Sequence, residues 1–201
     1  MATTNNDLLF YKESLIQAEH ELKFIHESTG KALKDIVGKV FEDHRERVWR
    51  HFGFDVSKDK HGASFDVDWS ITWQGKLIAF EEDKGHYVDS CFMERAITGF
   101  CKTINAYQKI GKPIPLLILH SFTRYNLYIE KLQEDLDTRK TEIIDEINNK
   151  LVYTTLVERD RFTGKKNKWF STGVYDCYSV NASDELILKD IEFIRSLIPV
   201  S

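Results

Sequence analysis

The sequence is poor in the residues that mark several large protein classes. It has three cysteines and three prolines in 201 residues, and Cys91, Cys101 and Cys177 show no CxxC spacing. An odd number of cysteines outside any metal-binding spacing argues against a disulfide framework. The seven histidines form no HExxH or related pattern. A structural zinc site is therefore not expected.

Glycine-rich nucleotide motifs and long apolar runs are also missing. The chain has no Walker or Rossmann pattern and no GxSxG, which disfavours P-loop nucleotide hydrolysis and serine hydrolysis. No segment reaches the length of a transmembrane helix, and the first residues lack the basic and apolar parts of a signal peptide. We expect an intracellular, cytoplasmic protein with no membrane partner.

The composition that remains is that of a folded, slightly acidic domain. Hydrophobic residues make up 42% of the chain and aromatic residues 12%, which favours a packed core over disorder. The 28 lysines and arginines stand against 32 aspartates and glutamates, a net charge of −4. This charge argues against an obvious nucleic-acid binder, although an acidic enzyme can still carry a local basic groove.

The strongest local pattern lies in residues 65–84. Apolar and polar side chains alternate over 65–73, as in a strand. Gln74-Gly75 is a turn signal, and 76–84 is a second strand with an apolar centre and the charged end Glu81-Glu82-Asp83-Lys84. The pattern predicts a β-hairpin with acidic residues and a lysine gathered at one end.

Two registers are open for this hairpin, and they gather different side chains. A three-residue loop with its glycine in a left-handed bulge would put Asp68 on the face that carries Glu82 and Lys84. A two-residue loop would put Asp68 with Glu81 and Asp83, because a slip of one residue exchanges the faces of a strand. We favour the first register, since it gathers carboxylates and an amine.

Crowded carboxylates call for a compensating charge. A hard divalent cation such as Mg²⁺, bound through oxygen ligands and several retained waters, is the usual compensation, and Mn²⁺ can take its place. A neighbouring lysine can orient or help deprotonate a metal-bound water. The charged end of the hairpin is therefore suited to hydrolysing a phosphodiester.

The spacing of these residues resembles a known family. Asp68, followed after thirteen residues by Glu82-Asp83-Lys84, is similar to the core of the PD-(D/E)xK nuclease superfamily, which includes most type II restriction endonucleases. The resemblance implies that Asp68 and Glu82 bind the metal and that Lys84 positions or activates the attacking water. It also implies that the main-chain carbonyl of Asp83 completes the metal shell.

Two residues depart from the pattern of the family. Val67 stands where the family has proline, and Asp83 stands where it usually has an apolar side chain. The second departure leaves open whether Glu81 or Asp83 does part of the work assigned to Glu82. Asp66 and Glu81 are accordingly auxiliary acidic candidates.

Amphipathic periodicity predicts helices over 7–29 and 31–52, ahead of the hairpin. In many nucleases of the family a glutamate on such a helix reaches the metal region. On that resemblance Glu42 is the first auxiliary candidate and Glu46 the second. The competing interpretation, which we favour at this point, is a solvated helix face with internal Glu and Arg pairs.

The elements after the hairpin follow an α/β order. A helix is expected from about 89 to 110, then a strand at Pro115–His120 that is buried on both faces, and a closing helix over 183–197. We predict an α/β fold with a mixed central sheet flanked by helices, a restriction-endonuclease-like core, and a C-terminal β-hairpin and helix.

A single domain over 1–201 is expected from the length. Its parts are a helical region at 1–55, a catalytic core at 56–122, and an elaboration at 123–201. The elaboration combines an acidic helix over 127–150 with a β-hairpin, and it is the expected region of DNA contact or dimerisation.

Basic side chains mark the expected DNA contacts. Lys165, Lys166 and Lys168 lie in the turn of the C-terminal hairpin, next to aromatic residues, which suits contacts to phosphates and bases. Arg95 and Lys102 lie on the polar face of the helix after the catalytic hairpin. Both sets also fit an ordinary solvated surface.

These features predict a metal-dependent, sequence-specific DNA endonuclease similar to a small type II restriction enzyme. The family implies double-stranded DNA as substrate and a homodimer, since a two-fold site calls for a two-fold protein. One alternative is a cap-snatching-type RNA endonuclease, in which His44 or His51 would have to bind the metal. The other is a non-catalytic DNA-binding module, which would need neither metal nor Glu82 and Lys84.

Overall fold

A computed structural model gives the fold of this chain. It describes residues 5–31, 33–58, 67–84, 102, 109–112, 115–121, 151–155 and 184–199. Most of the helix expected between 89 and 110, all of the acidic helix over 127–150, and the turn of the C-terminal hairpin lie outside these residues.

The helices with described bounds are α1 (Asn5–Thr29), α2 (Leu33–His51) and α6 (Asp184–Ser196). They confirm the three helices predicted at the two ends of the chain. Gly30 ends α1 with a φ of 68° and donates its N–H to the carbonyl of His26 at 2.9 Å, a helix stop that glycine adopts without steric strain. No helix in the described ranges is both long and apolar enough to cross a bilayer.

Within the described residues the sheet is mixed and has five strands in chain order. They are β1 (Asp55–Ser57), β2 (Trp69–Trp73), β3 (Lys76–Lys84), β4 (Leu116–Ser121) and β5 (Leu151–Thr155). The first three strands pair antiparallel, and β3, β4 and β5 pair parallel. This confirms the predicted α/β class and mixed sheet, with β3 between an antiparallel and a parallel neighbour.

The hairpin turn is shorter than predicted, but the side chains face as predicted. Trp73 pairs with Lys76, so the loop has two residues rather than three; Gln74 and Gly75 both have positive φ, 49° and 77°, as in a type I′ turn. A bulge then shifts the register, because Thr72 pairs with Leu77 but Ile71 pairs with Ala79. The extra residue restores the facing that the three-residue loop was predicted to give.

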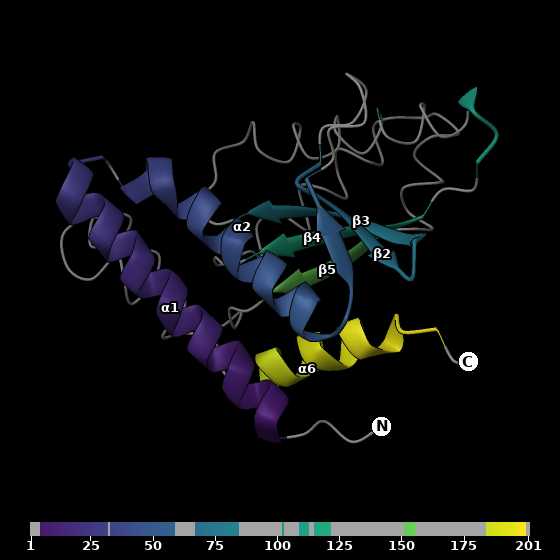
Figure 1. The fold of residues 1–201 in the computed structure, drawn as a ribbon, viewed down its shortest axis with the longest axis horizontal. Coiled ribbons are helices and arrows are strands. Elements are labelled where there is room, and N and C mark those ends of the chain that lie inside the picture. The colour runs from purple at the N-terminus through teal and green to yellow at the C-terminus, as the bar shows by residue number, and fades with distance from the viewer. Residues whose placement is uncertain are drawn as a thin grey trace, which may run out of the picture.

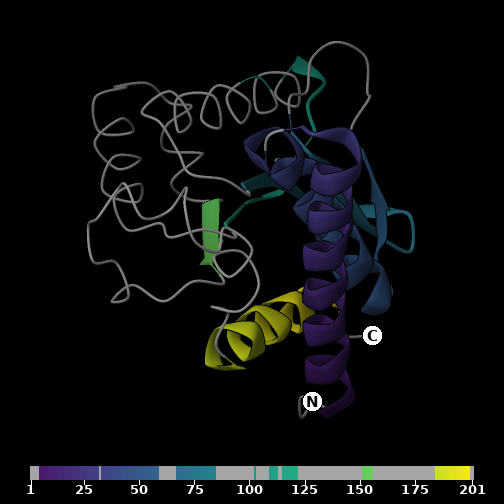
Figure 2. The same ribbon diagram turned by 90° about the vertical axis from the view of Figure 1, so that its left-hand side faces the viewer.

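The described helices pack together beside the sheet (Figure 1). Helix α2 contacts β1 and β3, α6 contacts β5, and α1 packs against both α2 and α6. Figure 2 shows α1 and α6 crossing, so that the two ends of the chain meet on this side. The acidic end of β3 is therefore held from the helix side by elements that are distant in sequence.

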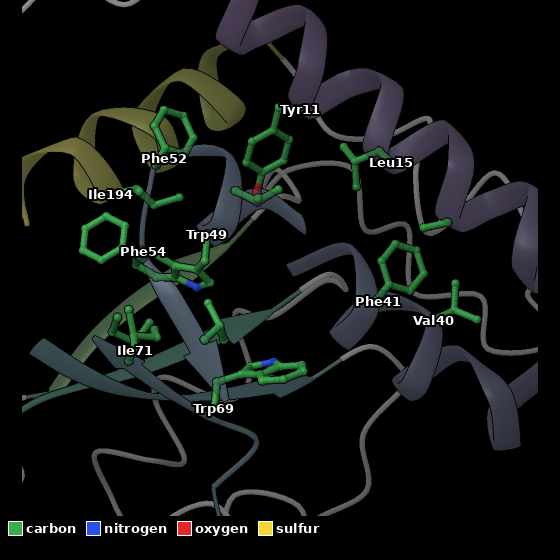
Figure 3. Packing of buried hydrophobic residues seen from close by; sticks show 14 of the residues in the cluster. Tyr11, Leu15, Val40, Phe41, Trp49, Phe52, Phe54, Trp69, Ile71 and Ile194 are labelled. Atoms are coloured by element: carbon green, nitrogen blue, oxygen red, sulfur yellow. The ribbon is translucent and has the colours of Figure 1, made fainter. Parts of the chain in front are cut away.

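The core between helices and sheet is aromatic (Figure 3). Trp49 and Phe54 stack edge to face at a centroid distance of 5.1 Å, and Trp69 and Ile71 of β2 are buried beneath them. Full burial of a side chain such as Ile71 stabilises the fold by about 1.5–3 kcal/mol. This packing fixes β2 and β3 against α2, and with them the acidic residues at their ends.

Candidate active site

The acidic end of β3 is buried. Glu81, Glu82 and Asp83 are 0%, 8% and 6% exposed, which is unusual for three consecutive carboxylates. Successive residues of a strand point to opposite faces, so Glu81 and Asp83 share one face and Glu82 lies on the other. Arg45 of α2 binds Glu81, which identifies the first face as the one toward the helices.

Glu81 is fully compensated. Arg45 donates to both of its oxygens, from Nε to Oε1 at 2.7 Å and from Nη2 to Oε2 at 3.0 Å. Trp49 donates its indole N–H to Oε1 at 2.8 Å. A buried ion pair needs this geometry and these extra hydrogen bonds to offset its desolvation. These contacts anchor Glu81, and with it β3, to α2; the auxiliary role considered from the sequence stays a prediction.

Arg45 also binds a carboxylate from the other end of the chain. Its guanidinium contacts Asp190 of α6, and the hydroxyl of Tyr11 donates to the same carboxylate at 2.7 Å. Burial alone would lower the pKa of Arg45, but Asp190 and Glu81 outweigh it and raise that pKa well above its usual range. One cation thus ties α1, α2, α6 and β3 together.

Asp83 has fewer partners than Glu81. Trp69 donates its indole N–H to Oδ2 at 2.8 Å, while Oδ1 is buried and has no hydrogen-bond partner among the described residues. Burial, then the charges of Glu81 and Asp68, raises the pKa of Asp83 well above its usual range; Arg45 and the Trp69 bond oppose this shift only in part. Asp83 is a buried acid whose charge is poorly compensated.

Asp68 joins the two strands at this end. It lies one residue before β2, and its Oδ2 accepts the backbone N–H of Asp83 at 2.7 Å. Continuing the register from the pair Trp69 and Glu81 by one residue places Asp68 opposite Glu82. The residues that form the motif in the sequence are therefore together in space, which is the facing that we favoured.

No family model matches this chain, and no curated protein is significantly similar to it in sequence. The roles of the acidic residues consequently rest on their contacts and on the resemblance of the motif.

Glu42 of α2 and Lys58, which follows β1, extend the cluster. Lys58 contacts Oε2 of Glu42 at 2.6 Å, and its ammonium lies 5.1 Å from the centroid of the Trp69 ring. Partial burial alone would lower the pKa of Lys58, but the bond to Glu42 and the charges of Glu42 and Asp68 raise it. Glu46 instead pairs with Arg50 on its own helix. Of the two predicted glutamates, Glu42 is the one linked to the hairpin.

The histidines required by the RNA-nuclease alternative face α1. The Nδ1 of His44 lies 2.8 Å from the hydroxyl of Ser14, and the Nε2 of His51 lies 3.0 Å from Asp7. Burial, followed by the charge of Arg45, lowers the pKa of His44 well below its usual range. Neither contact directs a histidine to the acidic end of the hairpin.

A divalent cation fits the chemistry of this site. In the part of the chain that the structure describes, no three His, Cys, Asp or Glu side chains are grouped as a preformed metal centre. Mg²⁺, however, is commonly held through one or two carboxylates together with waters and substrate phosphates. Asp68 and the unpartnered oxygen of Asp83 supply hard oxygen donors of this kind.

Several predicted site residues lie outside the described residues. Lys84 ends β3, but only its backbone is described, and Lys102 is exposed. The auxiliary and DNA-contact candidates for which the structure describes nothing are Asp66, Arg95, Lys165, Lys166 and Lys168.

The sequence analysis missed the residues that hold the acidic strand in place. Arg45 stands on the buried stripe of α2 with Phe41 and Val48, and Asp190 stands between Ile187 and Ile191 in α6. Charged residues at apolar positions of two helices are a signal of an internal ion pair. The sequence contains this signal, but it does not show which residues pair with each other.

Proposed function

We propose that this protein is a metal-dependent DNA endonuclease of the PD-(D/E)xK type, similar to a type II restriction enzyme. The observation that carries the proposal is the hydrogen bond from the backbone of Asp83 to Asp68, which brings the two halves of the motif together. The buried acidic strand at the centre of a mixed sheet supports it, because burying carboxylates is costly unless they serve a purpose such as cation binding.

The proposed reaction is hydrolysis of a phosphodiester bond in double-stranded DNA. Asp68 and Glu82 hold Mg²⁺, or Mn²⁺ in its place, and when bound the cation supplies charge stabilisation for the phosphate and acidifies a water. Lys84 holds the attacking water in line with phosphorus, and the leaving 3′ oxygen departs so that the product keeps a 5′-phosphate. Glu42 neutralises Lys58 beside the site.

Cutting both strands of a palindromic site requires two copies of the chain, so the proposed enzyme acts as a homodimer. The basic residues at 165–168, with Arg95 and Lys102, are the proposed contacts to DNA phosphates. No specific observation favours the RNA-nuclease alternative.

Cleavage of a long, sequence-diverse duplex DNA tests the proposal. We expect discrete fragments with Mg²⁺, none with EDTA, and a loss of about a hundredfold or more in the Lys84→Ala variant, as expected when a group that acts on the attacking water is removed. Lys76→Ala is the matched control, because Lys76 is the exposed first residue of the strand that Lys84 ends.

Three results separate this proposal from its alternatives. Cleavage that survives Lys84→Ala but not EDTA would remove the lysine from the mechanism. Binding of DNA without any cleavage, unchanged in the Glu82→Gln variant, would identify a non-catalytic binding module. Cutting of single-stranded RNA with Mn²⁺ in preference to DNA would identify the RNA endonuclease.

A further inference from the structure

The resemblance assigns Asp83 only a main-chain role, but the structure gives its side chain an unusual position. The carboxylate is 6% exposed, and Oδ2 accepts the indole N–H of Trp69. Oδ1 is buried and makes no hydrogen bond within the described ranges. A buried carboxylate oxygen without a partner costs several kcal/mol relative to water, so such a group calls for an explanation.

A second carboxylate contacts the backbone of the same residue. Asp68 Oδ2 is 2.7 Å from the backbone nitrogen of Asp83, so the acidic group of Asp68 is held next to the same residue. Burial, and after it the charges of Glu81 and Asp68, raise the pKa of Asp83, because like charges disfavour the ionised form. Arg45, a buried cation whose charge lowers the pKa of Asp83, is already engaged by Glu81 and Asp190.

The side chains of Asp83 and Glu82 lie on opposite faces of β3. This follows because the two residues are consecutive in the strand. Asp68 lies one residue before β2, opposite Glu82 by the register, and its carboxylate accepts the backbone N–H of Asp83. Asp68 is therefore close to Asp83 as well as to Glu82, and Asp68 and Asp83 together offer two carboxylates.

We propose that Asp83 binds the divalent cation through its own side-chain carboxylate, with Asp68 as the second carboxylate ligand of the same ion. This inference rests on the proposed function, which it deepens by changing the ligands: the side-chain carboxylate of Asp83 takes the place of Glu82 and of the main-chain carbonyl of Asp83. Oδ1 is the ligand atom, because Oδ2 is held by Trp69. Trp69 then fixes the orientation of the carboxylate, as partners outside the ligand set do in metal sites.

Calorimetric titration of Mn²⁺ into the full chain tests the ligand without reference to activity. We expect Asp83→Asn to weaken Mn²⁺ affinity by about ten- to a hundredfold or more. Substitution of groups that only orient the ligands already costs about this much, and loss of a ligand should cost no less. Glu185→Gln, an exposed acid of α6, is the matched control and should bind as wild type. Asp68→Asn should lose affinity like Asp83→Asn.

The outcomes separate the inference from the proposed function. Wild-type protein that binds Mn²⁺, with Asp83→Asn binding equally well, would overturn this inference and leave the nuclease proposal standing with Glu82 and the main-chain carbonyl of Asp83 as ligands beside Asp68. Wild-type protein that binds no Mn²⁺ would overturn the metal-dependent function and this inference with it.

A thiol substitution keeps the test decisive if Asp83→Asn does not fold. Asp83→Cys places a soft ligand at the same position, and soft thiolates favour Cd²⁺ over Mn²⁺. We expect a sulfur-to-cadmium charge-transfer absorption in Asp83→Cys that is absent from wild type and from Glu82→Cys. The same absorption in Glu82→Cys and not in Asp83→Cys would overturn the assignment.

Discussion

Glu81 and Asp83 are buried carboxylates on the same face of the same strand, yet their surroundings differ. Glu81 accepts three hydrogen bonds from described side chains, two from Arg45 and one from Trp49. Asp83 accepts one side-chain bond, from Trp69, and no ion pair joins it to a described residue. The Glu81 carboxylate is compensated by side chains of α2, whereas Oδ1 of Asp83 has no hydrogen-bond partner among the described residues.

The difference shows that one strand can hold a carboxylate that stabilises the fold and another that is able to bind a ligand. A paired carboxylate such as Glu81 fixes the strand against α2, but its lone pairs are used. An uncompensated one such as Asp83 lowers stability and keeps a donor atom for a ligand, which is a common arrangement at functional sites. Substitutions should therefore separate the two residues by their effects on stability and on metal binding.

The largest effect is expected from Arg45→Met, which makes Glu81 resemble Asp83. Glu81 and Asp190 would then be buried without their shared cation, and we expect the free energy of unfolding to fall by about 3–5 kcal/mol. Urea denaturation followed by tryptophan fluorescence measures this. Lys23→Ala, in an exposed pair with Glu27, is the control and should keep the wild-type midpoint. A loss below about 1 kcal/mol would contradict the role given to Arg45.

Local patterns in the sequence predict most of the elements, because periodicity is a local property. The alternation over 65–73 and the apolar run at 115–120 predict strands, and β4 indeed lies inside the sheet between β3 and β5, with Leu117 and Ile118 buried. The three-residue strand β1 is too short to show a period and was missed. The two-residue turn with its bulge was also missed, since alternation gives the same facing for either solution.

The compensation of charges could not be predicted in the same way. Arg45 and Asp190 are 145 residues apart, and Arg45 and Glu81 are 36 apart. No local pattern pairs residues across such separations; only the packing of α2 and α6 near β3 does. The sequence therefore identifies the acidic run correctly, but not which carboxylate in it is already neutralised.

The next largest effect is the contrast between Glu81→Gln and Asp83→Asn in metal-free buffer. We expect Glu81→Gln to lower the free energy of unfolding at pH 7 by about 2–3 kcal/mol, because hydrogen bonds to a charged group are lost. Asp83→Asn should raise it, because an amide of the same shape removes the repulsion from Asp68 and Glu81. Urea denaturation of both variants with EDTA present measures the contrast, and equal losses would contradict it.

The pH dependence of this contrast follows from the raised pKa of Asp83. In the unfolded chain an aspartate titrates near pH 4, at about 3.9, whereas in the folded protein Asp83 holds its proton to higher pH. The unfolded state thus binds fewer protons between these two pKa values, and stability falls as pH rises there. The advantage of Asp83→Asn over wild type should grow from about pH 4 upward and level off above the folded pKa. An advantage that shrinks with rising pH would contradict the assignment.

The smallest effect is expected from Lys58→Ala, which tests whether a cation at the edge of the cluster already offsets Asp68. Lys58 is 44% exposed and pairs with Glu42, so its removal should leave the urea midpoint nearly unchanged. The positive charge of Lys58 repels a divalent cation near Asp68. The interaction energy of an exposed charge with a neighbouring charge is about 0.2–1 kcal/mol. We therefore expect Mn²⁺ affinity to rise by about 1.5- to 5-fold in calorimetric titration. Lys76→Ala, at the far end of β3, controls for the general change in charge, and an equal rise in that variant would show that Lys58 has no specific influence on the site.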